Sequence, residues 1–252
     1  MFGRNRRNAG ADSPFWKQQG WILSAAFLAV ALVMAGVTWL TTGEDQPADR
    51  ARAAARNGPL SSSSKGGKRG DGRPDNCRTD DSNDAKPTVS PDDIEWRPLG
   101  AAKVPASRSA GPLQTSGPLM WCFAHTPMGA VMAAHIIPTH MSGRDWRTVT
   151  EQQVVAGAGR DIFVAQRSTV PESAQNGNAV SSYAGFAVDS YSPDAAKVQI
   201  LIKSGSGSGY ASTFIAMKWD GGDWKVQPGS NGSLYTSMTT VTGNAGFIMW
   251  KA

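Results

Sequence analysis

Residues 21–40 constrain the fold of this chain most strongly, because they form one apolar run, WILSAAFLAVALVMAGVTWL, with no charged residue and no proline. About 20 such residues at ~1.5 Å rise per residue span the ~30 Å hydrocarbon core of a bilayer. Backbone polar groups inside a bilayer must be paired within the segment, so this run predicts a transmembrane helix. Trp21 and Trp39 lie near its ends, where indole rings favour the membrane interface.

The charges around this run predict its orientation. Residues 1–20 carry four basic side chains and one acidic side chain, whereas Glu44, Asp45 and Asp49 follow the run. The positive-inside rule makes residues 1–20 a basic cytoplasmic tail and places the C-terminal part outside the cell membrane. The outer flank is also somewhat basic, so the reverse orientation is an alternative.

Two other interpretations of the run are a cleaved signal peptide and a buried helix of a soluble domain. A signal peptide has a shorter apolar region, of roughly 7–15 residues, followed by a small-x-small cleavage site. Residues 41–44, TTGE, form only a weak site of that kind, and a low-complexity stretch follows instead of a surrounding domain. We therefore expect an uncleaved, single-pass signal anchor.

Residues 41–91 predict a disordered linker. This stretch is rich in Gly, Ser and charged residues and contains few large apolar side chains, as in SSSSKGGKRGDGRPDN. Such a composition cannot bury enough apolar surface to offset the entropy lost on ordering. We expect a tether that holds a folded domain of residues 92–252 away from the bilayer.

The chain has two cysteines, Cys77 and Cys122, and both lie outside the membrane in this topology. An even pair in an oxidising compartment suggests one disulfide. That bond would join the end of the linker to the start of the folded domain and add roughly 2–4 kcal/mol of stability. Two free thiols are the alternative.

Helices are predicted in the first half of the domain. Thr126 and Pro127 suit the N-cap and first position of a helix, and apolar residues then recur at a spacing of three to four until Pro138 ends or kinks it. A second helix is expected from Asp145 to about Val155, where glycines break it. Asp161 is expected to cap a third helix that ends near Ser168.

The pattern then changes to the period of two that is typical of strands. Strands are expected at residues 183–192, 197–203, 210–219 and 224–226, with a final apolar element at 245–250. Helices followed by antiparallel strands predict an α+β domain whose helices pack on one face of the sheet.

The sequence contains no pattern that assigns catalysis, a metal or a cofactor. The three histidines lack the spacing of a metal site, and nucleotide-binding and nucleophile motifs are absent from the sequence. The GAGRD stretch at 157–161 resembles an anion-holding turn, although helix connectors of this composition are commoner. The formal net charge is +5, but no basic face is interleaved with aromatic residues, so we expect no nucleic acid.

Five residues are candidates for a functional site. Trp219 and Trp224 flank a tight turn, where they form either a cross-strand pair that fastens a hairpin or an exposed partner-binding patch. Asp189, Tyr191 and His125 are candidates for the lining of a pocket, although polar alternation on a half-exposed strand explains Asp189 and Tyr191 equally well.

Several stretches together resemble an uncharacterised family of actinobacterial membrane-anchored proteins encoded by mobile elements. They are CFAHTP at 122–127, DWR at 145–147, EQQVV at 151–155, GAGRD at 157–161, AGF at 184–186, YSPD at 191–194, KWDGGDWKV at 218–226 and AGFIMW at 245–250. Members of that family occur alongside conjugation-type ATPases, and they have no assigned catalytic residues that could be transferred to this chain.

A looser resemblance is to the single-span assembly subunit of type IV secretion systems and to TcpC-type conjugation proteins. That resemblance implies a cone-like domain of the nuclear-transport-factor or cystatin kind, with helices packed on a curved antiparallel sheet. Cone folds also include isomerases, so the resemblance supports the fold more than the function.

Our main hypothesis is a non-enzymatic, membrane-anchored structural subunit of a conjugation or type IV secretion-like complex. Its outer domain would contact other subunits, including copies of itself. The alternative is an extracytoplasmic cone domain that binds a small ligand or acts as an isomerase. An immunity or lipoprotein-like factor is a third option, but no lipobox cysteine ends the apolar run.

Overall fold

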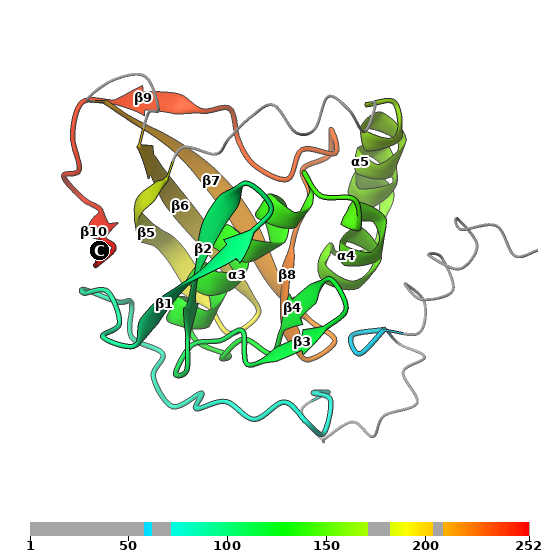
Figure 1. The fold of residues 1–252 in the computed structure, drawn as a ribbon, viewed down its shortest axis with the longest axis horizontal. Helices are drawn as coiled ribbons and strands as arrows, with labels where there is room; N and C mark the ends of the chain where they lie inside the picture. The colour runs from blue at the N-terminus through cyan, green and yellow to red at the C-terminus, as the bar shows by residue number, and fades with distance from the viewer. Residues whose placement is uncertain (1–57, 62–71, 171–181, 204–208, 252) are drawn as a thin grey trace, which may run out of the picture. The chain divides into compact units, whose positions relative to one another are not determined.

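The computed structural model describes residues 58–61, 72–170, 182–203 and 209–251 (Figure 1). The tail at 1–20 and the apolar run at 21–40 lie outside these residues. Among the described helices, none is both long enough and apolar enough to cross a membrane. The described part has an α+β architecture with antiparallel sheets, as the sequence predicts.

The elements follow the predicted order of helices and then strands, preceded by two short hairpins. In chain order they are β1 (Ile94–Leu99), β2 (Ala102–Ser107), β3 (Gln114–Ser116), β4 (Leu119–Trp121), α3 (Pro127–His140), α4 (Trp146–Gln153), α5 (Ala158–Ser168), β5 (Tyr183–Ser192), β6 (Ala195–Lys203), β7 (Tyr210–Asp220), β8 (Asp223–Val226), β9 (Thr239–Val241) and β10 (Ile248–Met249).

The main sheet has the strand order β10-β5-β6-β7-β8, and β9 pairs with the same edge of β7 as β8. All of these pairings are antiparallel. β5 has the bounds that its alternating pattern predicts, and the expected strands at 197–203 and 210–219 correspond to β6 and β7 with small extensions. The hairpins β1–β2 and β3–β4 form two separate two-stranded sheets.

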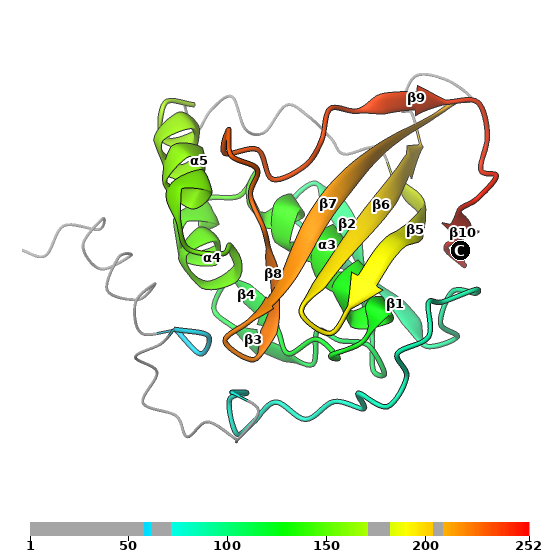
Figure 2. The same ribbon diagram turned by 180° about the vertical axis from the view of Figure 1, so that it is seen from behind.

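Helix α3 occupies the centre of the described fold. Its N-cap is Thr126, whose side chain accepts a hydrogen bond from the backbone N–H of Gly129 at 3.1 Å, and Pro127 begins the helix as predicted. Most of its side chains are buried, because α3 lies between the β1–β2 hairpin and the main sheet (Figures 1 and 2). A helix that is apolar on all sides needs such cover.

Of the two outcomes expected at Pro138, an end of the helix is wrong, since α3 continues through Pro138 to His140, and a kink stays a prediction. Proline removes a single backbone donor, and the hydrogen bond from Met141 N to the Pro138 carbonyl at 3.1 Å continues the last turn. The fully buried side chains of Ile136 and Ile137 hold this end against the core. Tertiary packing therefore outweighs the local helix-breaking preference.

The next two helices differ from the expectation in where they begin. α4 starts one residue later than expected and ends at Gln153, while α5 starts at Ala158 and not at Asp161. Gly157 has φ +138°, a conformation that favours glycine, and it occupies the N-cap position of α5. Gly159 lies inside α5, where an added Cβ would come within 2.7 Å of the Gly229 carbonyl oxygen. That glycine thus allows close packing and does not break the helix.

The folded part begins earlier than residue 92. We call residues 72–93 the strap, which runs below β3, β4 and β1 as the cyan segment in Figure 1. Arg73, Cys77 and Ser90 of the strap are 2%, 0% and 3% exposed, and Leu60 further upstream is 3% exposed. The backbone N–H of Leu60 donates to Gln152 Oε1 at 2.9 Å. A disordered linker over the whole of 41–91 is therefore incorrect for the described residues 58–61 and 72–91.

Candidate functional site

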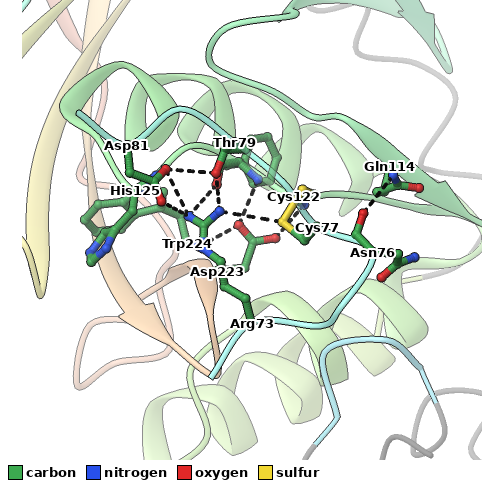
Figure 3. The surroundings of a disulfide bond; sticks show 11 residues. Arg73, Asn76, Cys77, Thr79, Asp81, Gln114, Cys122, His125, Asp223 and Trp224 are labelled. Atoms are coloured by element: carbon green, nitrogen blue, oxygen red, sulfur yellow. Dashed lines mark hydrogen bonds and ion pairs between the residues drawn. A yellow bond between two sulfur atoms is a disulfide. The ribbon is translucent and has the colours of Figure 1, made fainter. Parts of the chain in front are cut away.

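A disulfide between Cys77 and Cys122 joins the strap to the residue that follows β4, which confirms the predicted pairing (Figure 3). The two Cα atoms are 5.4 Å apart, within the usual range for a disulfide. Both cysteines are completely buried. Cys122 has φ +69°, a conformation that is uncommon for a residue with a Cβ.

The carboxylate of Asp223 supports the same segment from the other side. Its Oδ2 accepts the backbone N–H of Cys122 at 2.7 Å, and its Oδ1 accepts those of Phe123 and Trp224 at 3.0 Å each. Burial raises the pKa of Asp223 to about 6, while these hydrogen bonds and the positive charge of Arg73 lower it. The turn before Trp224 thus supplies a buried anion that organises the chain around the disulfide.

Arg73 places a buried positive charge beside this carboxylate. Its guanidinium lies 3.2 Å from Asp81 Oδ2 in an ion pair, donates to the Phe123 carbonyl at 3.2 Å and contacts Thr79. It also lies over the ring of Trp219, 4.8 Å from the centroid. A buried guanidinium needs such partners, so this set of contacts fixes the start of the strap.

Trp219 and Trp224 are directly opposed residues of β7 and β8, with ring centroids 5.4 Å apart. Trp224 is completely buried and donates from Nε1 to the Ala124 carbonyl at 3.0 Å, whereas Trp219 is half-buried. The ring of His125 stacks on Trp219 with centroids 3.8 Å apart. The pair therefore fastens the hairpin, and Trp224 contributes nothing to an exposed patch.

The three residues considered for a pocket are only partly brought together. Tyr191 donates from its hydroxyl to the His125 carbonyl at 3.2 Å, and burial together with Asp84 raises the pKa of Tyr191 to about 12. Asp189 is exposed and forms an ion pair with Lys197 at 3.0 Å. None of the three lines the cavity between α3, α5 and β5–β7 or the cavity between the strap and the start of α3.

An apolar cavity of about 360 Å³ lies between α3, α5, β5–β7 and residues 234–238. Its floor consists of side chains that are at most 4% exposed, namely Ala134, Ile200, Ile215 and Leu234. Its mouth carries exposed apolar side chains, since Val170, Tyr235 and Met238 are 44%, 52% and 59% exposed. A volume in this range suits a small molecule or one large side chain.

Polar groups in the cavity wall bond to the protein itself. Thr139 donates from Oγ1 to the His135 carbonyl at 2.6 Å, and the hydroxyl of Tyr183 lies 2.6 Å from that Oγ1. Thr213 donates to the Thr236 carbonyl at 2.7 Å. Burial raises the pKa of Tyr183, which keeps its hydroxyl neutral. The cavity therefore presents mainly apolar surface to an occupant.

Arg167 is the charged member of the described lining, and its Nε donates to the Met141 carbonyl at 3.0 Å at the end of α3. Its guanidinium lies 5.0 Å from the ring centroid of Trp146. The guanidinium of Arg147 lies over the same ring, 4.4 Å from its centroid. Arg167 thus connects α3, α4 and α5 beside the cavity.

His135 is buried behind this wall and acts as a structural residue. Its Nδ1 donates to the Val131 carbonyl at 2.8 Å, so its Nε2 is the atom that accepts from Trp250 Nε1 at 3.3 Å. Burial lowers the pKa of His135 to about 4 and that of His140 to about 4. No cluster of three or more metal-ligating side chains occurs among the residues that the structure describes.

A second cavity, of about 440 Å³, lies between the strap and the start of α3. Its wall includes Asp80, Lys86 and Val89 from the strap, the N-cap residue Thr126 and Met128 from α3. It is more polar than the first cavity, and its existence follows from the packing of the strap.

The fold and the two cavities define a disulfide-linked α+β domain with an open apolar cavity beside its central helix. The chain belongs to the family described as domain of unknown function DUF8175, whose model matches residues 58–249. Comparison with curated proteins and with solved structures found no match. The family match begins at residue 58, which agrees with the burial of Leu60 and Arg73 upstream of residue 92.

Sequence reasoning did not identify the cavity. Its lining comes from separate helices, strands and one loop, and each of these side chains fits the ordinary apolar pattern of its own element. The sequence offers one signal, the large apolar residues Tyr235 and Met238 in a segment without strong helix or strand periodicity, and both side chains are exposed in the structure.

Proposed function

We propose that this domain binds a small, largely apolar ligand in the 360 Å³ cavity beside α3 and acts by binding, not by catalysis. The observation that carries the proposal is an apolar cavity with a buried floor and an exposed apolar mouth. The described lining contains no histidine and no carboxylate, so it offers no acid–base pair from those side chains.

We also propose that the domain lies outside the cytoplasm and is anchored by residues 21–40. The buried disulfide supports this location, since disulfides persist mainly in oxidising compartments. A cone-like fold of the nuclear-transport-factor kind is our proposal for the finer architecture. Helices that precede a long antiparallel sheet, with a cavity between them, support it.

A structural subunit of a conjugation or type IV secretion-like complex is the second candidate. The exposed side chains of Val170, Tyr235 and Met238 favour it, because clustered exposed apolar residues often mark a partner surface. In that case an apolar side chain of another subunit, or of a second copy, would occupy the cavity.

The test of ligand binding uses the full-length chain in lipid nanodiscs and 1-octanol as the probe. Ala134→Leu adds bulk to the cavity floor, where Ala134 is completely buried. Ala165→Leu makes the same change at an exposed position of α5 and serves as the matched control. Equilibrium dialysis measures the octanol that is bound at saturation.

We expect saturable binding of octanol to the wild-type chain and to Ala165→Leu, and its loss in Ala134→Leu. Equal uptake by all three proteins would reflect partition into lipid and would refute the proposal. The second candidate is tested with a photo-crosslinking residue at Met238 in native cells. Crosslinks to secretion or conjugation subunits would support it, and crosslinks to none of them would count against it.

A further inference from the structure

We propose that the occupant of this cavity is a small amphiphile that enters with its apolar end first and keeps its polar head at the mouth. This inference rests on the proposed function and adds the class of ligand and its orientation. Three features of the described lining support it: the floor, the hydrogen bonds of the wall and the exposed mouth.

The floor excludes a polar end on chemical grounds. Ile200 and Ile215 are each 2% exposed, and Ala134 from α3 completes a surface without polar side-chain atoms. A hydroxyl or carbonyl group placed against them would lose its water and meet only aliphatic carbon. An unpaired buried polar group of this kind weakens binding roughly 10- to 100-fold.

The three hydroxyl groups of the wall do not offer a replacement donor. The hydroxyl of Thr139 donates to the His135 carbonyl, and that of Thr213 donates to the Thr236 carbonyl. Tyr183 lies 2.6 Å from Thr139 Oγ1, and because Thr139 already donates elsewhere, the Tyr183 hydroxyl is the donor in this contact. These three hydroxyl hydrogens are therefore used within the protein, and a ligand oxygen deep in the cavity gains no bond from them.

The mouth has the opposite character. Tyr235 is 52% exposed and presents a phenol beside the cavity, and Ser142 is also exposed there. The flexible thioether of Met238 lies at the same opening and adapts to different shapes. A polar head at this position stays in contact with water, so the ligand needs to lose only the hydration of its apolar end.

The experiment compares 1-octanol with 1,8-octanediol, which carries a hydroxyl at both ends. The diol must bury one hydroxyl if binding is apolar end first, so we expect it to bind roughly 10- to 100-fold more weakly, as one unpaired buried hydroxyl predicts. Binding is measured on the full-length chain in nanodiscs, and the Ala134→Leu variant provides the correction for lipid partition.

Two matched variants test the orientation directly. Ile215→Thr places a hydroxyl in the floor of the cavity. Ile215→Val is the control, because valine has almost the same shape as threonine but carries no hydroxyl. We expect Ile215→Thr to reduce the preference for octanol over the diol, and Ile215→Val to leave that preference unchanged.

The outcomes separate this inference from the proposed function. Equal affinity of wild-type protein for octanol and the diol would overturn the orientation while leaving the cavity as a binding site. An unchanged preference in Ile215→Thr would also overturn it. Absence of saturable binding by either alcohol would refute both the orientation and the proposed function.

Discussion

Replacing Cys77 and Cys122 together with alanine is expected to lower the free energy of unfolding by about 4 kcal/mol. The two cysteines are 45 residues apart, and for a loop of this length the chain-entropy model gives about 4 kcal/mol. Both residues are completely buried, so the removed sulfur atoms also leave small voids that add to the loss. The strap between residues 77 and 93 would lose its cross-link at Cys77 and would stay attached covalently only through β1.

Urea unfolding of the full-length chain in nanodiscs, followed by tryptophan fluorescence, measures this loss. Reductant should destabilise the wild-type protein by a similar amount and leave the double-alanine variant unchanged, which is the control for packing effects. Hydrogen exchange should increase in the strap before it increases in β5–β7. A loss below about 1 kcal/mol would refute the reasoning. It would show that the disulfide does not reduce the conformational entropy of the unfolded chain beyond what other contacts already do.

Three further predictions concern single buried positions. Gly129→Ala should cost at least about 2 kcal/mol in urea unfolding, because the new Cβ would lie 1.9 Å from the Ala124 carbonyl oxygen and the start of α3 must shift. Burial lowers the pKa of His135 from 6.5 to about 4, so the free energy of unfolding falls by about 3 kcal/mol as the pH falls through this range. His135→Gln should remove this part of the acid dependence, and an unchanged dependence of unfolding on pH would show that His135 is not its source. Burial raises the pKa of Asp223 from 3.8 to about 6, so this group contributes its full stability below pH 3.8, and the free energy of unfolding falls by about 3 kcal/mol as the pH rises to 6. Asp223→Asn should abolish this decline in urea unfolding curves measured between pH 3.8 and 6. A decline that persists in the variant would show that another group is responsible.

The features that the sequence predicts correctly are those with a local signal. Thr126 and Pro127 mark the start of α3 because capping depends on a few adjacent residues. β5 follows the alternation of residues 183–192, since the period of two fixes which side chains face the core. The disulfide follows from the presence of only two cysteines in the sequence.

The features that were not predicted depend on contacts between distant segments. The strap has the composition of a linker, yet the hydrogen bond of Arg73 to the Phe123 carbonyl and its contact with Trp219 hold it on the fold. Asp223 has the pattern of an ordinary turn residue, and only the fold brings the backbone of Cys122 and Phe123 to its carboxylate. The cavity likewise depends on how helices and strands meet, which no single stretch encodes.

The covalent attachment of the strap also determines how the domain bears mechanical load. Tension that enters from the N-terminal side meets the contact of Leu60 with Gln152, then the contacts of Arg73 with Phe123 and Trp219, and then the bond between Cys77 and Cys122. Force thereby reaches the junction of β4 and α3, and the disulfide gives it a covalent route that bypasses the strap beyond residue 77. A domain built in this way resists being pulled apart from its N-terminal side for as long as the disulfide is intact, and reduction transfers the load to the strap.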